Sequence, residues 1–238
     1  MSIDPPPSHQ ETEEAAMKAL GEDLERRFRT TTTQLHVAGR ELTLVHPAKA
    51  DELIDEEAFD RDERLPYWAD IWPAARALAA RVAAMRGRGQ SLLELGCGAG
   101  LVATCAALAG FEVCATDYYE EALLFTQLNV WRNTGYVPRI RLADWRRLPT
   151  DLGRHDVVVG SDVLYERPYG ELVARAIDIT LTGGGEVLLA DPGRIATEQF
   201  LQSVADRGLR VVGHERQTMS EGTIKQTIDI YRLRRARR

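Results

Sequence analysis

The stretch from Ser91 to Gly100, SLLELGCGAG, limits the possible folds of this chain more than any other segment. Its first half is an apolar run, typical of a strand that is covered on both faces. An alanine-rich segment from Ala99 to Ala109 follows and has the composition of a buried helix. The glycines between them permit positive φ angles and let a ligand approach the positive end of the helix. This order predicts the nucleotide-binding opening of a doubly wound sheet, although an ordinary turn between a strand and a helix has the same order.

The spacing of the glycines discriminates between cofactors. A dinucleotide fingerprint has the pattern G-x-G-x-x-G, which would place its third glycine where this chain has Leu101. Glu94 also places a carboxylate beside the turn, where it would repel the phosphates of a nicotinamide dinucleotide. A cationic ligand suits the turn better, so the sequence argues against a dehydrogenase.

The segment ELGCGAG resembles motif I of the seven-strand (class I) methyltransferases, which use S-adenosylmethionine. The resemblance implies an α/β fold with a Rossmann-like, doubly wound and mostly parallel sheet of seven strands that ends in an antiparallel hairpin. It also implies S-adenosylmethionine as the cofactor, which carries an ammonium and a sulfonium but no phosphate. The residues near the turn that we assign to this cofactor are Glu94, Gly96, Gly98 and Gly100.

Acidic residues end the next two predicted strands and are candidates for contacts with the cofactor. Phe111 to Thr116 predicts a strand ending at Asp117, whose carboxylate can accept hydrogen bonds from both ribose hydroxyls or can cap the next helix. Arg139 to Ala143 predicts another strand, which ends at Asp144 and Trp145. A carboxylate there can accept from the exocyclic amine of adenine, and an indole can cover the adenine ring.

The fourth predicted strand, from His155 to Gly160, leads into the sequence SDVLY at 161–165. The carboxyl ends of parallel strands meet at one edge of a sheet, so this segment is a candidate catalytic loop beside the cofactor. We assign Ser161 to the cofactor, and Asp162 and Tyr165 to catalysis, because an acceptor ammonium must lose its proton before it can attack. Binding the cofactor's own ammonium is the alternative role of Asp162, and packing under the loop is that of Tyr165.

Three further motifs resemble the subfamily of these methyltransferases that modifies lysines in proteins and includes the enzymes acting on the electron-transfer flavoprotein β subunit. They are YWADIWPAA at 67–75, DVLYE at 162–166 and DPGR at 191–194. Together the motifs extend the resemblance over residues 65 to 235. In that subfamily a tryptophan matching Trp72 lies against the methionine end of the cofactor. Attachment of the N-terminal extension to the core is the alternative role of Trp72 and of Tyr67.

The remaining segments complete the predicted fold. Residues 1–64 are expected to form an N-terminal extension with a tail, a helix from Glu11 to Arg29, a hairpin from Gln34 to Val45, a helix from Ala50 to Phe59 and a linker. Residues 65–238 are expected to form the methyltransferase domain. Its other predicted helices are 119–133, 169–180 and 195–206, and its other predicted strands are 186–190, 209–214 and 223–233. The last two strands pair antiparallel because their connection is short, and Gly183 to Gly185 is predicted as a loop.

Composition limits the class of protein. The 238 residues carry a formal net charge of −6, which gives no long-range attraction to nucleic acid, and we interpret the C-terminal RLRRARR as a solvated end. Cys97, Cys105 and Cys114 lack metal-type spacing and predict reduced core residues. No apolar stretch reaches ~18 residues and no signal peptide is evident, so we expect a soluble cytoplasmic protein with no membrane association.

These observations predict an S-adenosylmethionine-dependent N-methyltransferase whose acceptor is the lysine side chain of a protein. In-line methyl transfer needs no metal and no covalent enzyme intermediate, so positioning and desolvation carry most of the catalysis. A small-molecule amine methyltransferase would share every cofactor residue. A catalytically silent S-adenosylmethionine-binding module is the other alternative, because a fold does not guarantee turnover.

Overall fold

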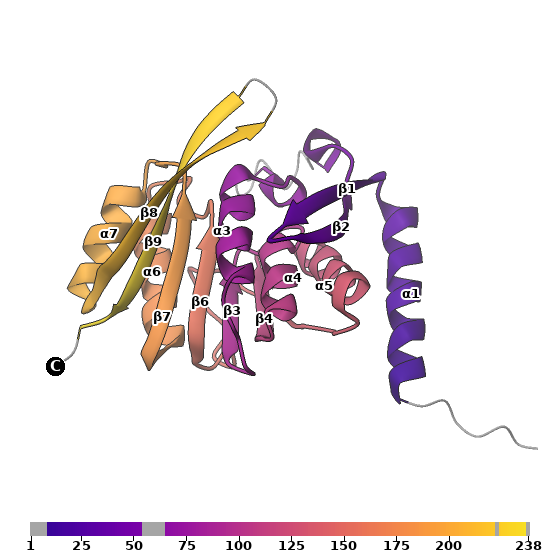
Figure 1. The fold of residues 1–238 in the computed structure, drawn as a ribbon, viewed down its shortest axis with the longest axis horizontal. Helices are drawn as coiled ribbons and strands as arrows, with labels where there is room; N and C mark the ends of the chain where they lie inside the picture. Colours follow the sequence, from indigo (N-terminus) through magenta and orange to yellow (C-terminus); the bar gives the residue numbers. More distant parts are fainter. Residues whose placement is uncertain (1–8, 54–64, 222–223, 237–238) are drawn as a thin grey trace, which may run out of the picture.

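The computed structural model describes residues 9–53, 65–221 and 224–236, and its centre is a seven-stranded sheet of order β5-β4-β3-β6-β7-β9-β8 (Figure 1). Strand β9 runs antiparallel to both of its neighbours, and all other neighbouring strands are parallel. The predicted doubly wound sheet with a C-terminal antiparallel hairpin is therefore confirmed. The strands are β3 (Ser91–Leu95), β4 (Glu112–Asp117), β5 (Arg139–Leu142), β6 (His155–Ser161), β7 (Leu181–Asp191), β8 (Leu209–Glu221) and β9 (Ile224–Arg235).

Alternation of side chains along the central strands divides the interior into two cores. Leu92 and Val157 face a core shared with α3 and α4, whereas Leu93 and Val158 face a core shared with α6 and α7. The helices therefore cover both faces of the sheet, as a mostly parallel sheet requires. They are α3 (Pro73–Ala83), α4 (Leu101–Leu108), α5 (Glu120–Thr134), α6 (Tyr169–Thr180) and α7 (Thr197–Asp206). The three cysteines are free and buried.

The N-terminal residues form a helix, α1 (His9–Arg27), and a separate two-stranded sheet of β1 (Thr30–Val37) and β2 (Arg40–Pro47). The predicted helix and hairpin are therefore present. Ala38 and Gly39 at the turn have φ angles of 50° and 79°, which suits a two-residue turn between twisted strands. A single 3₁₀ turn, Ala50–Leu53, follows the hairpin.

Two asparagines of α5 attach the hairpin to the rest of the molecule. Asn129 accepts from the backbone N–H of Val45 at 2.8 Å and donates to its carbonyl at 2.7 Å. Asn133, one helical turn further on, makes the same pair of bonds with Thr43 at 3.0 and 2.9 Å. Asn129 also donates to the carbonyl of Ala99, at 2.9 Å, so one side chain links the hairpin to the glycine-rich turn.

Three expectations are corrected. The predicted helix from Ala50 to Phe59 is only the 3₁₀ turn as far as Leu53, and its remainder lies outside the described residues. The glycines at 183–185 lie within β7, where the register with β6 is irregular, instead of forming a loop. The described part of the basic C-terminal run is not a free end, because β9 continues to Arg235 and its arginines pair with acids on β7 and α6; Arg237 and Arg238 lie outside the described residues.

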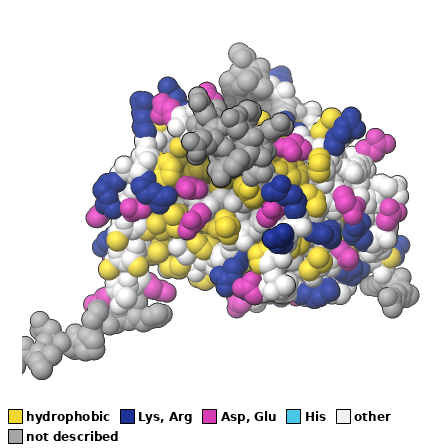
Figure 2. All heavy atoms as spheres, turned by 180° about the vertical axis from the view of Figure 1, so that it is seen from behind, with side chains coloured by type: hydrophobic (Ala, Val, Ile, Leu, Met, Phe, Trp, Pro, Cys, Tyr) yellow, Lys and Arg dark blue, Asp and Glu magenta, His cyan; other side chains and the backbone are white. Residues whose placement is uncertain are grey.

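The surface opposite to the view of Figure 1 carries basic and acidic side chains interspersed with apolar ones (Figure 2). On this face no field of one sign is visible among the described residues. None of the described helices combines the length and apolar character needed to cross a bilayer.

Candidate functional site

A cavity lies at the carboxyl ends of β3, β4 and β6, where the loops after these strands meet the segment that precedes α3. From β3 the chain continues to β4 and β5 on one side of the sheet, and then to β6 and β7 on the other side. The strand order therefore reverses at β3, and α/β sheets bind ligands at such a switch point. The structure brings nearly all of the predicted site residues together here. Those that line the cavity are Trp72, Glu94, Gly96, Gly98, Asp117, Asp144, Trp145, Ser161, Asp162 and Tyr165.

The three glycines of the turn all have positive φ, but they face different neighbours. A Cβ on Gly96 would lie 3.0 Å from Val163, and one on Gly98 would lie 3.1 Å from the carbonyl oxygen of Trp68. Gly100 is not among the cavity-lining residues, and a Cβ there would lie 2.7 Å from the Cα of Thr126 on α5. Gly96 and Gly98 therefore shape the cavity floor, whereas Gly100 allows α4 and α5 to pack closely.

The charged residues that line the cavity are all acidic. No Lys, Arg or His is among the described lining residues. The five carboxylates are those of Asp70, Glu94, Asp117, Asp144 and Asp162. Such a wall suits a cationic ligand and opposes phosphates.

Asp117 ends β4 and is 6% exposed. Its Oδ2 accepts from the backbone N–H of Gly98 at 2.9 Å, and its Oδ1 accepts from that of Tyr119 at 3.1 Å. Burial raises the pKa of this carboxyl, and the backbone donors partly offset the effect. A carboxylate has about four lone-pair directions, so Asp117 can still accept a hydroxyl group beside its backbone donors.

Glu94 lies in the middle of the sheet and is 1% exposed. Burial raises the pKa of its carboxyl well above the usual range, and the charge of Asp117 adds to the increase. Its Oε2 has no hydrogen-bond partner among the described residues. A buried acceptor without a partner is rare in folded proteins and indicates that a ligand completes the site.

Asp144 and Trp145 follow β5 on the other side of the cavity. Asp144 accepts from the Nε of Arg146 with both oxygens, each at 3.0 Å. The indole of Trp145 packs edge-on against Tyr169 with a centroid distance of 5.5 Å, and its buried Nε1 has no partner among the described residues. Arg175 fixes this loop by donating to the carbonyl of Trp145 at 2.9 Å.

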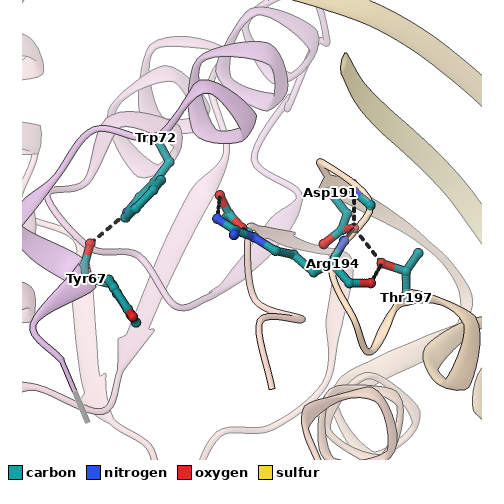
Figure 3. A network of polar contacts seen from close by, with 7 residues as sticks. Tyr67, Trp72, Asp191, Arg194 and Thr197 are labelled. Carbon is teal, nitrogen blue, oxygen red and sulfur yellow. Dashed lines mark hydrogen bonds and ion pairs between the residues drawn. The ribbon is translucent and has the colours of Figure 1, made fainter. Parts of the chain in front are cut away.

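Asp162 has a partner that the sequence did not predict, namely Arg194. The Nε and Nη2 of Arg194 lie 2.6 and 3.1 Å from the two carboxylate oxygens of Asp162. The guanidinium also lies 5.7 Å from the ring centroid of Trp72. Figure 3 shows Arg194 extending from the Asp191 side of the site toward Trp72. The pair therefore borders the cavity opposite the segment before α3.

Aromatic rings form the wall of the cavity near the catalytic loop. Tyr67 packs edge-on against Trp72 at 5.9 Å and against Tyr165 at 5.6 Å, and Tyr165 packs against Tyr169 at 4.9 Å. The indole Nε1 of Trp72 donates to the carbonyl of Tyr67 at 2.8 Å (Figure 3). Burial is the main cause that raises the pKa of the Tyr165 hydroxyl. Tyr165 is thus a neutral phenol near physiological pH.

Sequence reasoning missed several residues of this site. Tyr67 was considered only as a link between extension and core, and neither Asp70 nor Tyr169 was singled out, although all three line the cavity. Arg194 occurred in the DPGR motif but received no role. The ion pair between Arg194 and Asp162 joins residues that are 32 positions apart in the sequence. Sequence spacing alone therefore does not reveal that this arginine lies beside a candidate catalytic acid.

Comparisons with known proteins agree on one family. A family model described as lysine methyltransferase matches residues 62–207. The electron transfer flavoprotein beta subunit lysine methyltransferase of Danio rerio is 31% identical over 157 residues, which cover 63% of this chain and 57% of that protein. The protein-lysine methyltransferase METTL21E of Mus musculus is 30% identical over 125 residues, which cover 47% of this chain and 51% of that protein. The chain thus spans little more than half the length of these relatives.

Solved structures with low sequence identity share the fold. The N-methyltransferase NodS from Bradyrhizobium japonicum WM9, in complex with S-adenosyl-l-homocysteine, has a TM-score of 0.58 at 16% identity and covers 76% of this chain and 98% of its own. The magnesium protoporphyrin IX methyltransferase ChlM from Synechocystis PCC 6803, with bound SAM, has a TM-score of 0.54 at 18% identity. That match covers 75% of this chain and 91% of ChlM.

Proposed function

Because this chain belongs to the lysine methyltransferase family, we propose that it transfers a methyl group from S-adenosylmethionine to the side-chain amine of a lysine in a protein. The observation that carries the proposal is the cavity wall, in which five carboxylates and several aromatic rings occur without a basic residue among the described lining residues. A sulfonium and an amine suit this wall, whereas a pyrophosphate or a nucleic-acid backbone does not.

The residues present fit S-adenosylmethionine. Gly96 and Gly98 line the cavity without a side chain, and the Oε2 of Glu94, which has no partner among the described residues, offers a buried acceptor to a cation. We assign Asp117 to the ribose hydroxyls. We assign Asp144, which lines the same cavity beside Trp145, to the adenine amine. The rings assigned to the cofactor are Trp145 at the adenine and Trp72 at the methionine end. Ser161, the last residue of β6, also lines the cavity and is assigned to the cofactor.

The bound cofactor supplies an electrophilic methyl carbon on a sulfonium. The task of the protein is then to hold a neutral amine in line with it and to exclude water. Tyr67, Trp72 and Tyr165 provide the apolar wall for a lysine stem, and aromatic faces also bind the methylated ammonium that the reaction forms. As a neutral phenol, Tyr165 serves as wall and hydrogen-bonding group and not as the base.

We place the reaction in the cytoplasm. All three cysteines are buried and unpaired although secreted proteins of this size commonly form disulfides. A reducing compartment suits this state.

The proposal is tested by incubating the purified protein with cell lysate and methyl-labelled S-adenosylmethionine, followed by mass spectrometry. We expect label on lysines of a small number of proteins, and its loss when Asp117 is changed to alanine. The matched control is Asp151→Ala, since the side chain of Asp151 is 60% exposed and is not among the residues that line the cavity. Label only in small molecules or nucleic acid would contradict the lysine acceptor. Calorimetric binding of NAD in preference to S-adenosylmethionine would contradict the cofactor.

A further inference from the structure

The ion pair between Arg194 and Asp162 means that the catalytic loop presents a paired carboxylate, and not a free one, to an acceptor amine. Asp162 has a φ of 57°, a positive value that few residues other than glycine adopt, and its side chain is 5% exposed. Both of its oxygens already accept from the guanidinium, in the bidentate geometry that gives strong charge-assisted bonds. A proton on Asp162 would remove the negative charge that makes both of these bonds strong. Asp162 is therefore poorly suited to act as a base.

Asp191, which is fully buried at the end of β7, holds the backbone of Arg194 in place through hydrogen bonds. The Oδ1 of Asp191 accepts from the backbone N–H of Gly193 and of Arg194, both at 2.8 Å, and from the hydroxyl of Thr197 at 2.5 Å. The same hydroxyl lies 2.8 Å from the carbonyl oxygen of Arg194, so its single proton is shared between the two acceptors (Figure 3). The guanidinium is thus presented to Asp162 and Trp72 from a rigid turn.

We propose that Arg194 selects the protonation state of the acceptor: by neutralising Asp162, it prevents a bare carboxylate from holding the amine as an unreactive ammonium. The inference rests on the proposed transfer of methyl to an amine. The paired carboxylate keeps unused lone pairs that can accept an N–H of a neutral amine and orient its lone pair. Arg194 is on this account a positioning residue, and it acts through Asp162.

The reaction then balances without a protein base. The acceptor ammonium gives its proton to water, the nitrogen lone pair forms the new N–C bond, and the electrons of the C–S bond remain on sulfur as the cofactor becomes a neutral thioether. Among the described residues, the other titratable groups around the pair include Tyr165 and Glu166 on the same loop, Tyr169 on α6, Tyr67 before α3, Asp191 on β7, Glu94 on β3 and Asp117 on β4. None of these is a cation that could replace Arg194.

Binding of n-butylammonium to the protein saturated with S-adenosylhomocysteine tests the inference without turnover. We expect Arg194→Gln to bind this probe about tenfold more tightly at pH 7, equivalent to raising the pKa of the bound amine by about one unit. Arg194→Lys keeps the charge and should bind like the unchanged protein, and Arg194→Gln with Asp162→Asn should lose the gain. Arg216→Gln is the matched control, because Arg216 makes the same bidentate pair with Asp229 at 2.8 and 3.1 Å, on β8.

Kinetics give the second measurement, with any acceptor that the lysate experiment identifies. Arg194→Gln should lower both KM and kcat at pH 7 and displace the pH profile of kcat toward alkaline pH. If Asp162 were instead the catalytic base, removing its partner would raise kcat.

The inference is overturned if Arg194→Gln binds n-butylammonium no more tightly, or if the gain persists without Asp162. A merely structural role would instead lower the unfolding midpoint and weaken cofactor binding in both Arg194 variants. Failure of the unchanged protein to methylate any lysine contradicts the proposed function, while the binding measurement still decides the inference.

Discussion

Glu94 occupies a position where folding and ligand binding make opposite demands on one side chain. Burial raises its pKa, so the folded protein binds a proton there more strongly than the unfolded chain does. Stability from this group is therefore greatest below the unfolded pKa of about 4.3 and decreases as pH rises toward the folded pKa. A cationic ligand reverses the preference, because it favours the ionised form.

We expect Glu94→Gln to raise the free energy of unfolding at pH 8 by about 1 kcal/mol or more, since the amide has a similar shape but carries no charge that must be buried. The gain should shrink at pH 5, and binding of S-adenosylmethionine should weaken. Urea unfolding at both pH values and calorimetry check these outcomes. Glu112→Gln, at an exposed position of the neighbouring strand β4, is the control. Destabilisation by Glu94→Gln at pH 8 would mean that the carboxylate has a stabilising partner.

Asp117→Asn keeps the shape of the side chain and one acceptor oxygen. We expect it to weaken S-adenosylmethionine by about 1–3 kcal/mol, because a ribose hydroxyl loses its charged acceptor. Calorimetry against S-adenosylmethionine measures the change, with Asp151→Asn as the exposed comparison. Since Asp117 also holds the N–H groups of Gly98 and Tyr119, an unchanged affinity together with a lower melting temperature would assign it to the turn alone.

The sequence predicts the site residues that stand next to strand ends, because the carboxyl ends of parallel strands must meet. Asp117, Asp144 and Asp162 all follow this rule and line one cavity. It does not predict the partners of these acids. Arg194 reaches Asp162 from another loop through a long side chain, and Gly100 faces Thr126 because of the packing between α4 and α5. Such contacts depend on tertiary geometry and not on local pattern.

At the scale of elements, strands were predicted best where a short apolar run marks a buried strand, as in β3 and β6. β8 continues beyond the predicted end at His214 to Glu221, through a segment in which Met219 is the one apolar residue. Its backbone pairs with β9 throughout, with one register shift, so hydrogen bonding and not burial extends it. The glycines of β7 were predicted as a loop because glycine has low strand propensity, yet the ladder accommodates them as an irregularity.

The attachment of β2 to α5 gives a prediction at this scale. Asn129→Ala leaves both backbone groups of Val45 without partners in a buried place, at about 1–3 kcal/mol for each group. Asn133→Ala should have a smaller effect, since the backbone groups of Thr43 are near solvent. Chemical unfolding of the two variants measures the difference. Equal losses would show that the hairpin is held by its apolar side chains and not by these bonds.

At the scale of the whole molecule, the cavity lies where sheet, helices and N-terminal residues meet. The strand order turns back at β3, which leaves a crevice above its carboxyl end. The backbone of Trp68 closes over Gly98 from the segment before α3, and Trp68 packs in one cluster with Leu24 of α1 and Val45 of β2. We propose that the N-terminal extension is a structural part of the methyltransferase unit and not a separable addition.

Deletion of residues 1–64 tests this proposal. The hairpin contributes Leu35, Val37, Leu42 and Leu44 to the core that contains α3 and α4. Burial of each such side chain stabilises the folded state by about 1.5–3 kcal/mol. The four together therefore contribute an amount comparable with the whole free energy of unfolding of a typical domain, about 5–15 kcal/mol. We expect the fragment 65–238 to aggregate or to unfold without cooperativity, as seen by size-exclusion chromatography and circular dichroism. Deletion of residues 1–29 removes α1 and should lower the melting temperature while leaving cooperative unfolding and S-adenosylmethionine binding in place. A fragment 65–238 that melts cooperatively and binds S-adenosylmethionine like the full chain would make the extension separable after all.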